Sequence, residues 1–69
     1  MTPEHMVHMA NQIAQFFASY PHDEAVADIA DHLKKFWEPR MRRQIADYVA
    51  AEGGGLHPLM VEAVRTLGR

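Results

Sequence analysis

The stretch His32–Arg43 reads His-Leu-Lys-Lys-Phe-Trp-Glu-Pro-Arg-Met-Arg-Arg and holds the only tryptophan of the chain together with an internal proline. The residue before a proline is driven out of the α-helical region, whereas proline itself fits the first position of a helix. We therefore expect one helix to break at Glu38 and the next to begin at Pro39. The turn between these two helices must then be very short.

The same stretch concentrates the positive charge of the chain. Between positions 34 and 43 there are five of the seven Lys and Arg residues and one acid, Glu38, so this segment carries a formal +4, while the whole chain carries −2 and the remainder therefore −6. The five cations are Lys34, Lys35, Arg40, Arg42 and Arg43. A basic corner on an acidic body indicates an oriented interaction with a partner.

Helical periodicity extends on both sides of this stretch. Apolar residues recur at three- and four-residue spacing, Thr2-Pro3 is a typical helix start, and no alternating β-branched run predicts a strand. We predict an all-α fold, a small compact bundle of four short helices in one domain spanning residues 1–69. The predicted helices cover residues 3–20, 23–37, 39–52 and 58–67.

The apolar stripes of these helices predict the core. Its expected members are Ile13, Phe17, Ile29, Leu33, Ile45, Val49 and Val64. The methionines on the same stripes are expected to fill the core rather than to face a partner. The third helix should end at Gly53, where three consecutive glycines can adopt positive φ.

Size and composition restrict the class of protein. A domain of 69 residues buries only about 60% of the surface of its unfolded chain, so its stability is marginal. The absence of cysteine excludes disulfides and thiolate metal or iron–sulfur ligation, which leaves association with a partner as the remaining way to gain stability. No apolar run is long enough to span a bilayer and no signal peptide is evident, so we expect a cytoplasmic protein without membrane contact.

Catalytic and metal-binding patterns are not convincing. His5 and His8 are three residues apart on the first predicted helix, but no third ligand of matching spacing accompanies them. The residues Gly53 to Gly55 follow no strand and precede no Gly-Lys-Ser/Thr, so they do not form a phosphate loop. We therefore predict no catalytic residue, no metal ligand and no cofactor-binding residue in this chain.

The corner between the second and third helices is the predicted partner-binding site. Trp37 next to arginines has the composition of an interface hot spot, although the indole could instead fill the corner between the helices, and both interpretations stay open. An exposed or half-exposed Trp37 beside a rigid proline turn would be a preorganised contact. The predicted residues are Phe36, Trp37, Pro39, Arg40, Met41, Arg42 and Arg43. A second candidate surface is the flank of the first helix around Asn11, Gln12 and Phe16.

Three groups of residues carry a resemblance to a known family. They are Met9-Ala10-Asn11-Gln12-Ile13 with Phe16-Phe17, then Ala30-Asp31-His32 leading into Phe36-Trp37-Glu38-Pro39-Arg40-Met41-Arg42, and Gly55-Leu56 before Pro58-Leu59. With them the chain resembles, over nearly its whole length, the small delta subunit of cytoplasmic NAD-dependent, molybdenum-containing formate dehydrogenases. Glu38 departs mildly from the family pattern, in which this acid is often Asp.

The resemblance implies an accessory subunit that is not itself an enzyme. Its partner would be the large molybdenum-bearing subunit, in a complex that oxidises formate to carbon dioxide while reducing NAD. The molybdopterin guanine dinucleotide, iron–sulfur clusters and flavin would lie in the partner subunits, and none in this chain. Whether the chain is a permanent subunit or an assembly factor is left open.

Two other functions are compatible with the residues. The basic segment from Lys34 to Arg43 could serve a small nucleic-acid-binding module, which the net charge of −2 disfavours, so that no nucleic-acid partner is expected. Self-association of the isolated chain is a further way to cover a thin core.

Overall fold

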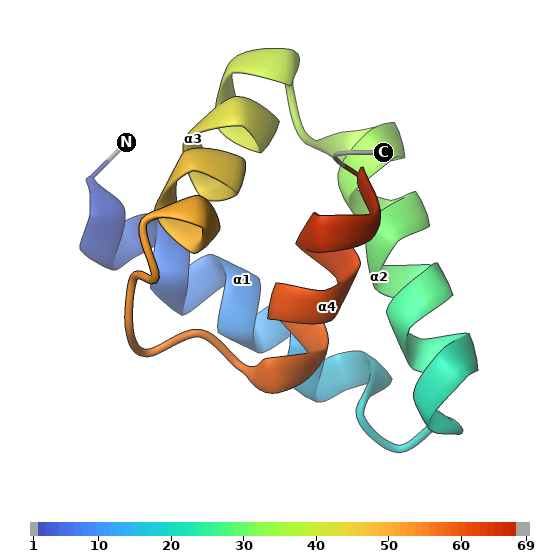
Figure 1. Cartoon of the computed structure of the whole chain (residues 1–69). Helices are drawn as coiled ribbons and strands as arrows, with labels where there is room; N and C mark the ends of the chain where they lie inside the picture. Colours follow the sequence, from blue (N-terminus) through green and yellow to red (C-terminus); the bar gives the residue numbers. More distant parts are fainter. Residues whose placement is uncertain (1, 68–69) are drawn as a thin grey trace.

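The structure, a computed structural model, describes residues 2–67. Its four helices are α1 (Pro3–Phe17), α2 (His22–Phe36), α3 (Pro39–Ala50) and α4 (Pro58–Leu67) (Figure 1). Within residues 2–67 there is no strand, so the all-α prediction is confirmed. The helix starts agree with the prediction to within one residue, whereas α1 and α3 end earlier than expected.

Local chemistry explains where the helices begin. At α1 the Thr2 hydroxyl oxygen accepts a hydrogen bond from the backbone N–H of His5 at 3.2 Å, as expected of an N-cap residue. At α3 the residue before the proline, Glu38, is extended (φ −65°, ψ 153°), and the helix begins at Pro39 as predicted. The turn between α2 and α3 consists of Trp37 and Glu38 only.

Helix α1 ends three residues before the predicted boundary because its last turn tightens. The backbone N–H groups of Ala18 and Tyr20 donate to the carbonyls three residues earlier, at 3.3 and 3.0 Å. Such bonds are typical of a 3₁₀ turn at a helix end. Tyr20 also precedes Pro21, which disfavours a helical conformation at Tyr20.

The end of α3 corrects the prediction that it reaches the glycines at residue 53. The N–H of Gly53 donates to the carbonyl of Tyr48 at 2.9 Å and that of Glu52 to Val49 at 3.0 Å, which is a Schellman motif. The residue with positive φ in this motif is Glu52, at 57°. Gly53 is needed for a different reason, because a Cβ at this position would clash with the Tyr48 ring. Of the three glycines, only Gly55 has a positive φ, at 89°.

Glu52→Gly is expected to stabilise the fold. A left-handed conformation costs a non-glycine residue about 1–2 kcal/mol. Glycine avoids this cost, but its greater conformational freedom stabilises the unfolded chain by about 0.5–1 kcal/mol. The free energy of unfolding should therefore rise by about 0.5–1 kcal/mol. Urea denaturation followed by circular dichroism measures this change. Glu4→Gly, at an exposed position in the first turn of α1, is the control and should lower stability. A Glu52→Gly variant no more stable than the original chain would contradict this account of the α3 terminus.

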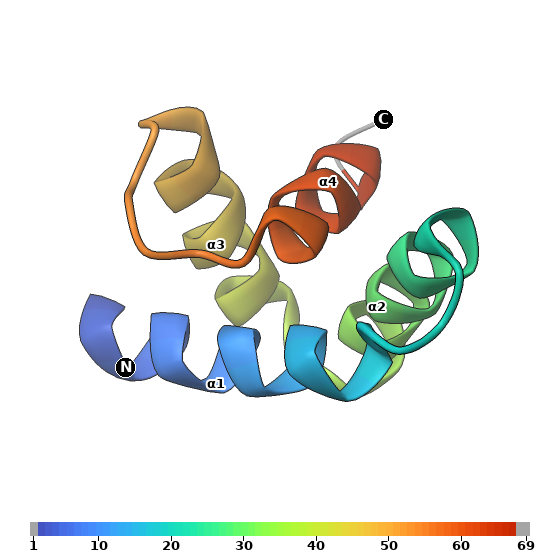
Figure 2. The same ribbon diagram turned by 90° about the horizontal axis from the view of Figure 1, so that it is seen from below.

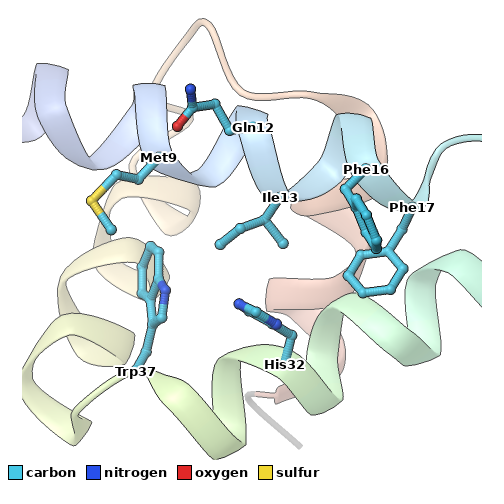
Figure 3. A pocket seen from close by; sticks show the side chains of 7 residues that line it. All are labelled: Met9, Gln12, Ile13, Phe16, Phe17, His32 and Trp37. Carbon is cyan, nitrogen blue, oxygen red and sulfur yellow. The ribbon is translucent and has the colours of Figure 1, made fainter.

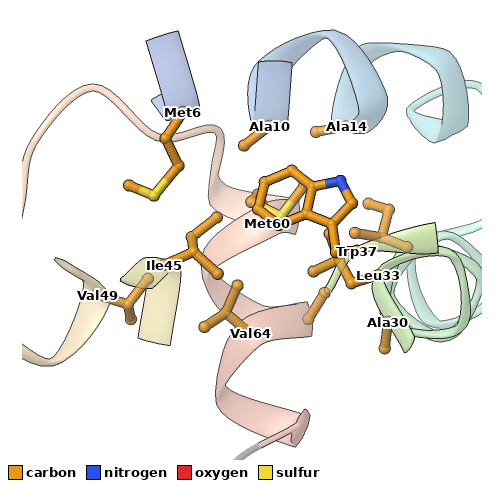
Figure 4. Close-up of a cluster of buried hydrophobic side chains, with 12 residues drawn as sticks. Met6, Ala10, Ala14, Ala30, Leu33, Trp37, Ile45, Val49, Met60 and Val64 are labelled. Atoms are coloured by element: carbon orange, nitrogen blue, oxygen red, sulfur yellow. The ribbon is translucent and has the colours of Figure 1, made fainter. Parts of the chain in front are cut away.

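The core is a single cluster to which all four helices contribute (Figure 4). Five of the seven predicted core residues are buried, namely Ile29, Leu33, Ile45, Val49 and Val64. The prediction is wrong for Ile13 and Phe17, which are only partly buried. Their places are taken by the α1 stripe Met6, Ala10 and Ala14. Small alanine side chains allow a helix to approach its neighbours closely. Helix α1 therefore turns this stripe toward the core, and the stripe with larger side chains lies beside it.

Helix α4 lies at the centre of the arrangement and contacts each of the other three helices. Helix α1 runs along one side of the molecule, with the other helices above it in Figure 2. The loop from α3 to α4 is held against α1 by Asn11, whose Nδ2 donates to the Gly55 carbonyl at 2.7 Å. The Oδ1 of the same side chain accepts from the N–H of His57 at 2.8 Å. In this arrangement the second apolar stripe of α1, with Met9, Ile13 and Phe16, faces α2.

Candidate partner-binding surface

Trp37 is buried in the core. Its side chain is 5% exposed and belongs to the same cluster as Met60 and Leu33. The backbone N–H of Trp37 donates to the carbonyl of Leu33 at 3.0 Å, which holds the residue at the end of α2. The expectation of an exposed or half-exposed indole is therefore wrong, because the ring fills the corner between α2 and α3 and leaves only an edge at the surface.

Arg42 has an intramolecular role that the sequence did not reveal. Its guanidinium donates from Nη1 to the carbonyls of Leu33 at 3.4 Å and Lys34 at 3.2 Å, and also to the carbonyl of Trp37. The last carbonyls of a helix have no partner within the helix, and a cation near them also complements the helix dipole. Arg42 of α3 therefore caps the carboxyl end of α2.

Three of the five cations of the predicted corner lie together. Lys34, Arg42 and Arg43 line one pocket against α4, together with Ala46, Val64 and Leu67. Lys35 forms an exposed ion pair with Asp31 at 2.9 Å. Arg42 thus caps α2 and also lies beside Lys34 and Arg43 in this pocket.

The exposed part of the predicted corner is smaller than the sequence suggested. Phe36 is 72% exposed, and Pro39, Arg40 and Arg43 are also exposed. Met41 is partly buried and packs against the core. The corner thus offers one large apolar side chain, Phe36, with arginines nearby.

An apolar groove adjoins this corner. It has a volume of about 490 Å³ and lies between α1 and α2 (Figure 3). Its lining residues are Met9, Gln12, Ile13, Phe16, Phe17, His32 and Trp37. In Figure 3 Ile13 of α1 and His32 of α2 extend toward one another across the groove, with Trp37 at one end, whereas Gln12 points away from α2. The exposed edge of Trp37 thus belongs to this groove.

Aromatic rings form the side of the groove farthest from Met9. Phe16 and Phe17 meet edge to face with their centroids 5.0 Å apart, and Phe17 lies 6.3 Å from the His32 ring. His32 in turn lies 4.8 Å from Phe36. Phe16 is 69% exposed, so two large aromatic side chains, Phe16 and Phe36, stand in solvent beside an apolar groove. Contiguous exposed apolar surface of this kind marks interaction sites.

Helix α1 carries almost no charge. Residues 5–22 contain no Asp, Glu, Lys or Arg, although many of their side chains are exposed. The centres of protein–protein interfaces are depleted of charged residues and enriched in aromatic residues and methionine. The second candidate surface of the sequence analysis lies partly here, since Gln12 and Phe16 line the groove. Asn11 instead faces the α3–α4 loop.

A charged cluster lies on another face, where α2 begins. The His22 ring contacts Asp23 at 2.9 Å and Glu62 of α4 at 2.5 Å. The hydrogen bond to Asp23 and then that to Glu62 raise the pKa of His22 above the usual 6.5. His5 and His8 are both exposed. In the part of the chain that the structure describes, no three or more His, Asp or Glu residues gather in a way that could hold a metal ion.

The His22 cluster predicts a pH dependence of stability. Because the pKa of His22 is raised above 6.5 in the folded chain, its contribution to stability is fully present below the unfolded value and is lost as the pH rises through the folded value. Urea denaturation should therefore find the stability difference between the original chain and His22→Ala larger at about pH 5.5 than at about pH 8. Glu62→Gln should reduce this dependence. If the stability difference between the original chain and His22→Ala does not depend on pH, the cluster does not raise the pKa of His22.

The comparisons with known proteins bear on all these residues. No curated protein and no solved structure matches the chain. None of the helices within residues 2–67 is long and apolar enough to cross a membrane. A family model described as NADH-dependent formate dehydrogenase delta subunit FdsD matches residues 5–64, which include the groove and the corner. The chain therefore belongs to the family of formate dehydrogenase delta subunits.

Proposed function

We propose that this chain is a non-catalytic accessory subunit of a cytoplasmic NAD-dependent, molybdenum-containing formate dehydrogenase. It binds the large molybdenum-bearing subunit and supports assembly, cofactor insertion or stability of the complex. The oxidation of formate and the reduction of NAD take place in the partner subunits, which hold the molybdopterin guanine dinucleotide, iron–sulfur clusters and flavin. The chain itself binds none of these groups.

The observation that carries this proposal is the uncharged, aromatic face of α1 and α2 on a chain of the delta-subunit family. An isolated small domain gains nothing by exposing Phe16 and Phe36, whereas a subunit buries such residues against a partner. The exposed Arg40 lies at the α2–α3 corner, three residues after Trp37. It can pair with a carboxylate of the partner at the rim of the interface, which sets orientation and association rate.

Reconstitution tests the proposal. The other formate dehydrogenase subunits are produced in cells that lack the delta subunit, and the purified chain is then added back or co-produced. We expect the chain to co-purify with the molybdenum-bearing subunit, and its absence to lower the molybdenum content or the formate-dependent reduction of NAD. Elemental analysis of the isolated chain should find no stoichiometric zinc, iron or molybdenum. An enzyme that neither binds the chain nor responds to it would contradict the proposal.

A further inference from the structure

We infer that the groove between α1 and α2 binds one amphipathic α-helix of the large subunit, with the apolar stripe of that helix in the groove and an acidic residue near Arg40. This inference rests on the proposed function and specifies the element of the partner that this chain recognises.

The helical walls of the groove favour a helix as the occupant. Both walls are helices that present side chains, and the described residues 2–67 offer no strand edge to which an extended peptide could add. Recognition must therefore come from side chains, as when an amphipathic helix lays residues at three- and four-residue spacing into an apolar groove. Phe16 of α1 lines the groove and is exposed, and exposed Phe36 of α2 stands beside it next to His32, so both rings can contact the sides of such a helix.

The residues of α1 show that the groove is more than a by-product of core packing. The helix carries two apolar stripes, of which the one with Met6, Ala10 and Ala14 is fully buried in the core. In the other, Met9 and Ile13 pack against the core but are only partly buried. The second stripe, with Met9, Ile13 and Phe16, is larger and lines the groove. Methionine adapts well to the surface of a partner. Because α1 has more apolar surface than the fold buries, the excess has to be covered by something else.

Charge determines the chemistry of the occupant. The groove lining contains no Asp, Glu, Lys or Arg, so the part of the partner inside it has to be uncharged as well. Exposed Arg40 follows Trp37 by three residues, so the chain holds its Cα within about 11 Å of that of Trp37. Asp28 lies one turn before His32 on α2, on the side away from Trp37 in the helix. A complementary helix therefore carries an acidic residue toward Arg40 and a basic or neutral one toward Asp28.

Two substitutions on the same helix test this inference. Gln12 lines the groove, whereas Gln15 is exposed on α1 outside it. Gln12→Glu places a charge among apolar side chains and should weaken binding to the purified enzyme lacking its delta subunit by about tenfold or more. Gln15→Glu makes the identical chemical change and should bind within about twofold of the original chain. Equal affinities of the two variants would overturn the inference.

A photoreactive benzoylphenylalanine in place of Phe16 identifies the occupant. Irradiation of the complex should join it to a segment of the large subunit with apolar residues at helical spacing and an acidic residue at one end. Joining to a charged or non-helical segment, or to a second copy of this chain, would overturn the inference while the proposed function stands. If the original chain does not bind the enzyme at all, the proposed function fails first, so the two failures are distinguishable.

Discussion

Trp37→Ala should remove a large part of the stability of the chain. Truncation of a buried Trp to Ala costs about 3–5 kcal/mol, because the apolar surface is lost and the surrounding residues cannot fill the space. A chain of 69 residues has a free energy of unfolding of roughly 3–10 kcal/mol in total. Since Trp37 lies where α2, α3 and the core meet, no other side chain is placed to take its position.

Phe36→Ala is the matched control for this experiment. The two aromatic residues are adjacent, but Phe36 is 72% exposed and Trp37 5%. Phe36→Ala should therefore change the free energy of unfolding by no more than about 0.5 kcal/mol. Far-ultraviolet circular dichroism with urea titration measures both variants. A Trp37→Ala variant that loses no more stability than Phe36→Ala would mean that the indole does not fill the corner.

Arg42→Ala should destabilise the fold by about 1–3 kcal/mol, the usual net contribution of hydrogen bonds made by a charged group. The substitution removes the donor shared by three carbonyls at the end of α2. Arg42→Lys should recover only part of this loss, because an ammonium group lacks the planar arrangement of donors in guanidinium. Urea denaturation of the purified variants provides the comparison.

Arg43→Ala controls for the loss of a nearby positive charge. Arg43 is exposed on the same helix, and its replacement should alter the free energy of unfolding by about 0.5 kcal/mol or less. If Arg42→Ala proves as mild as Arg43→Ala, the cap contributes nothing to stability. If it proves as severe as expected, a loss of partner binding in Arg42 variants would reflect unfolding. Partner binding at this corner is therefore tested with Arg40 and Arg43 instead.

The helices could be predicted from the sequence because their signals are local. Pro3, Pro39 and Pro58 each begin a helix, and Pro21 limits the one before it. The end of α3 was less predictable, since the positive φ belongs to Glu52 although glycine follows directly. Which residue takes the positive φ depends on the Tyr48 ring. This ring lies against Gly53, and its hydroxyl donates to the Gly54 carbonyl at 2.6 Å.

The functional surface was harder to predict because it depends on tertiary packing. Periodicity shows that α1 has apolar residues, but it does not say which of two adjacent stripes the core will use. The larger stripe, with Ile13 and Phe17, was the natural choice and the structure places it at the groove. Likewise, nothing local distinguishes Arg42, which caps α2, from Arg43, which does not. One signal was available in the sequence, namely the absence of Asp, Glu, Lys and Arg from residue 5 to residue 22.

Hydroxyl-radical labelling tests the central claim most directly, that the large subunit covers the face of α1 and α2. The oxidation of individual side chains is measured by mass spectrometry in the free chain and in the assembled enzyme. The account predicts that Phe16 and Phe36, both exposed in the free chain, become protected in the complex, while Leu59 of α4 is labelled to the same extent in both. Unchanged labelling of Phe16 and Phe36 in a complex that protects α4 would contradict it.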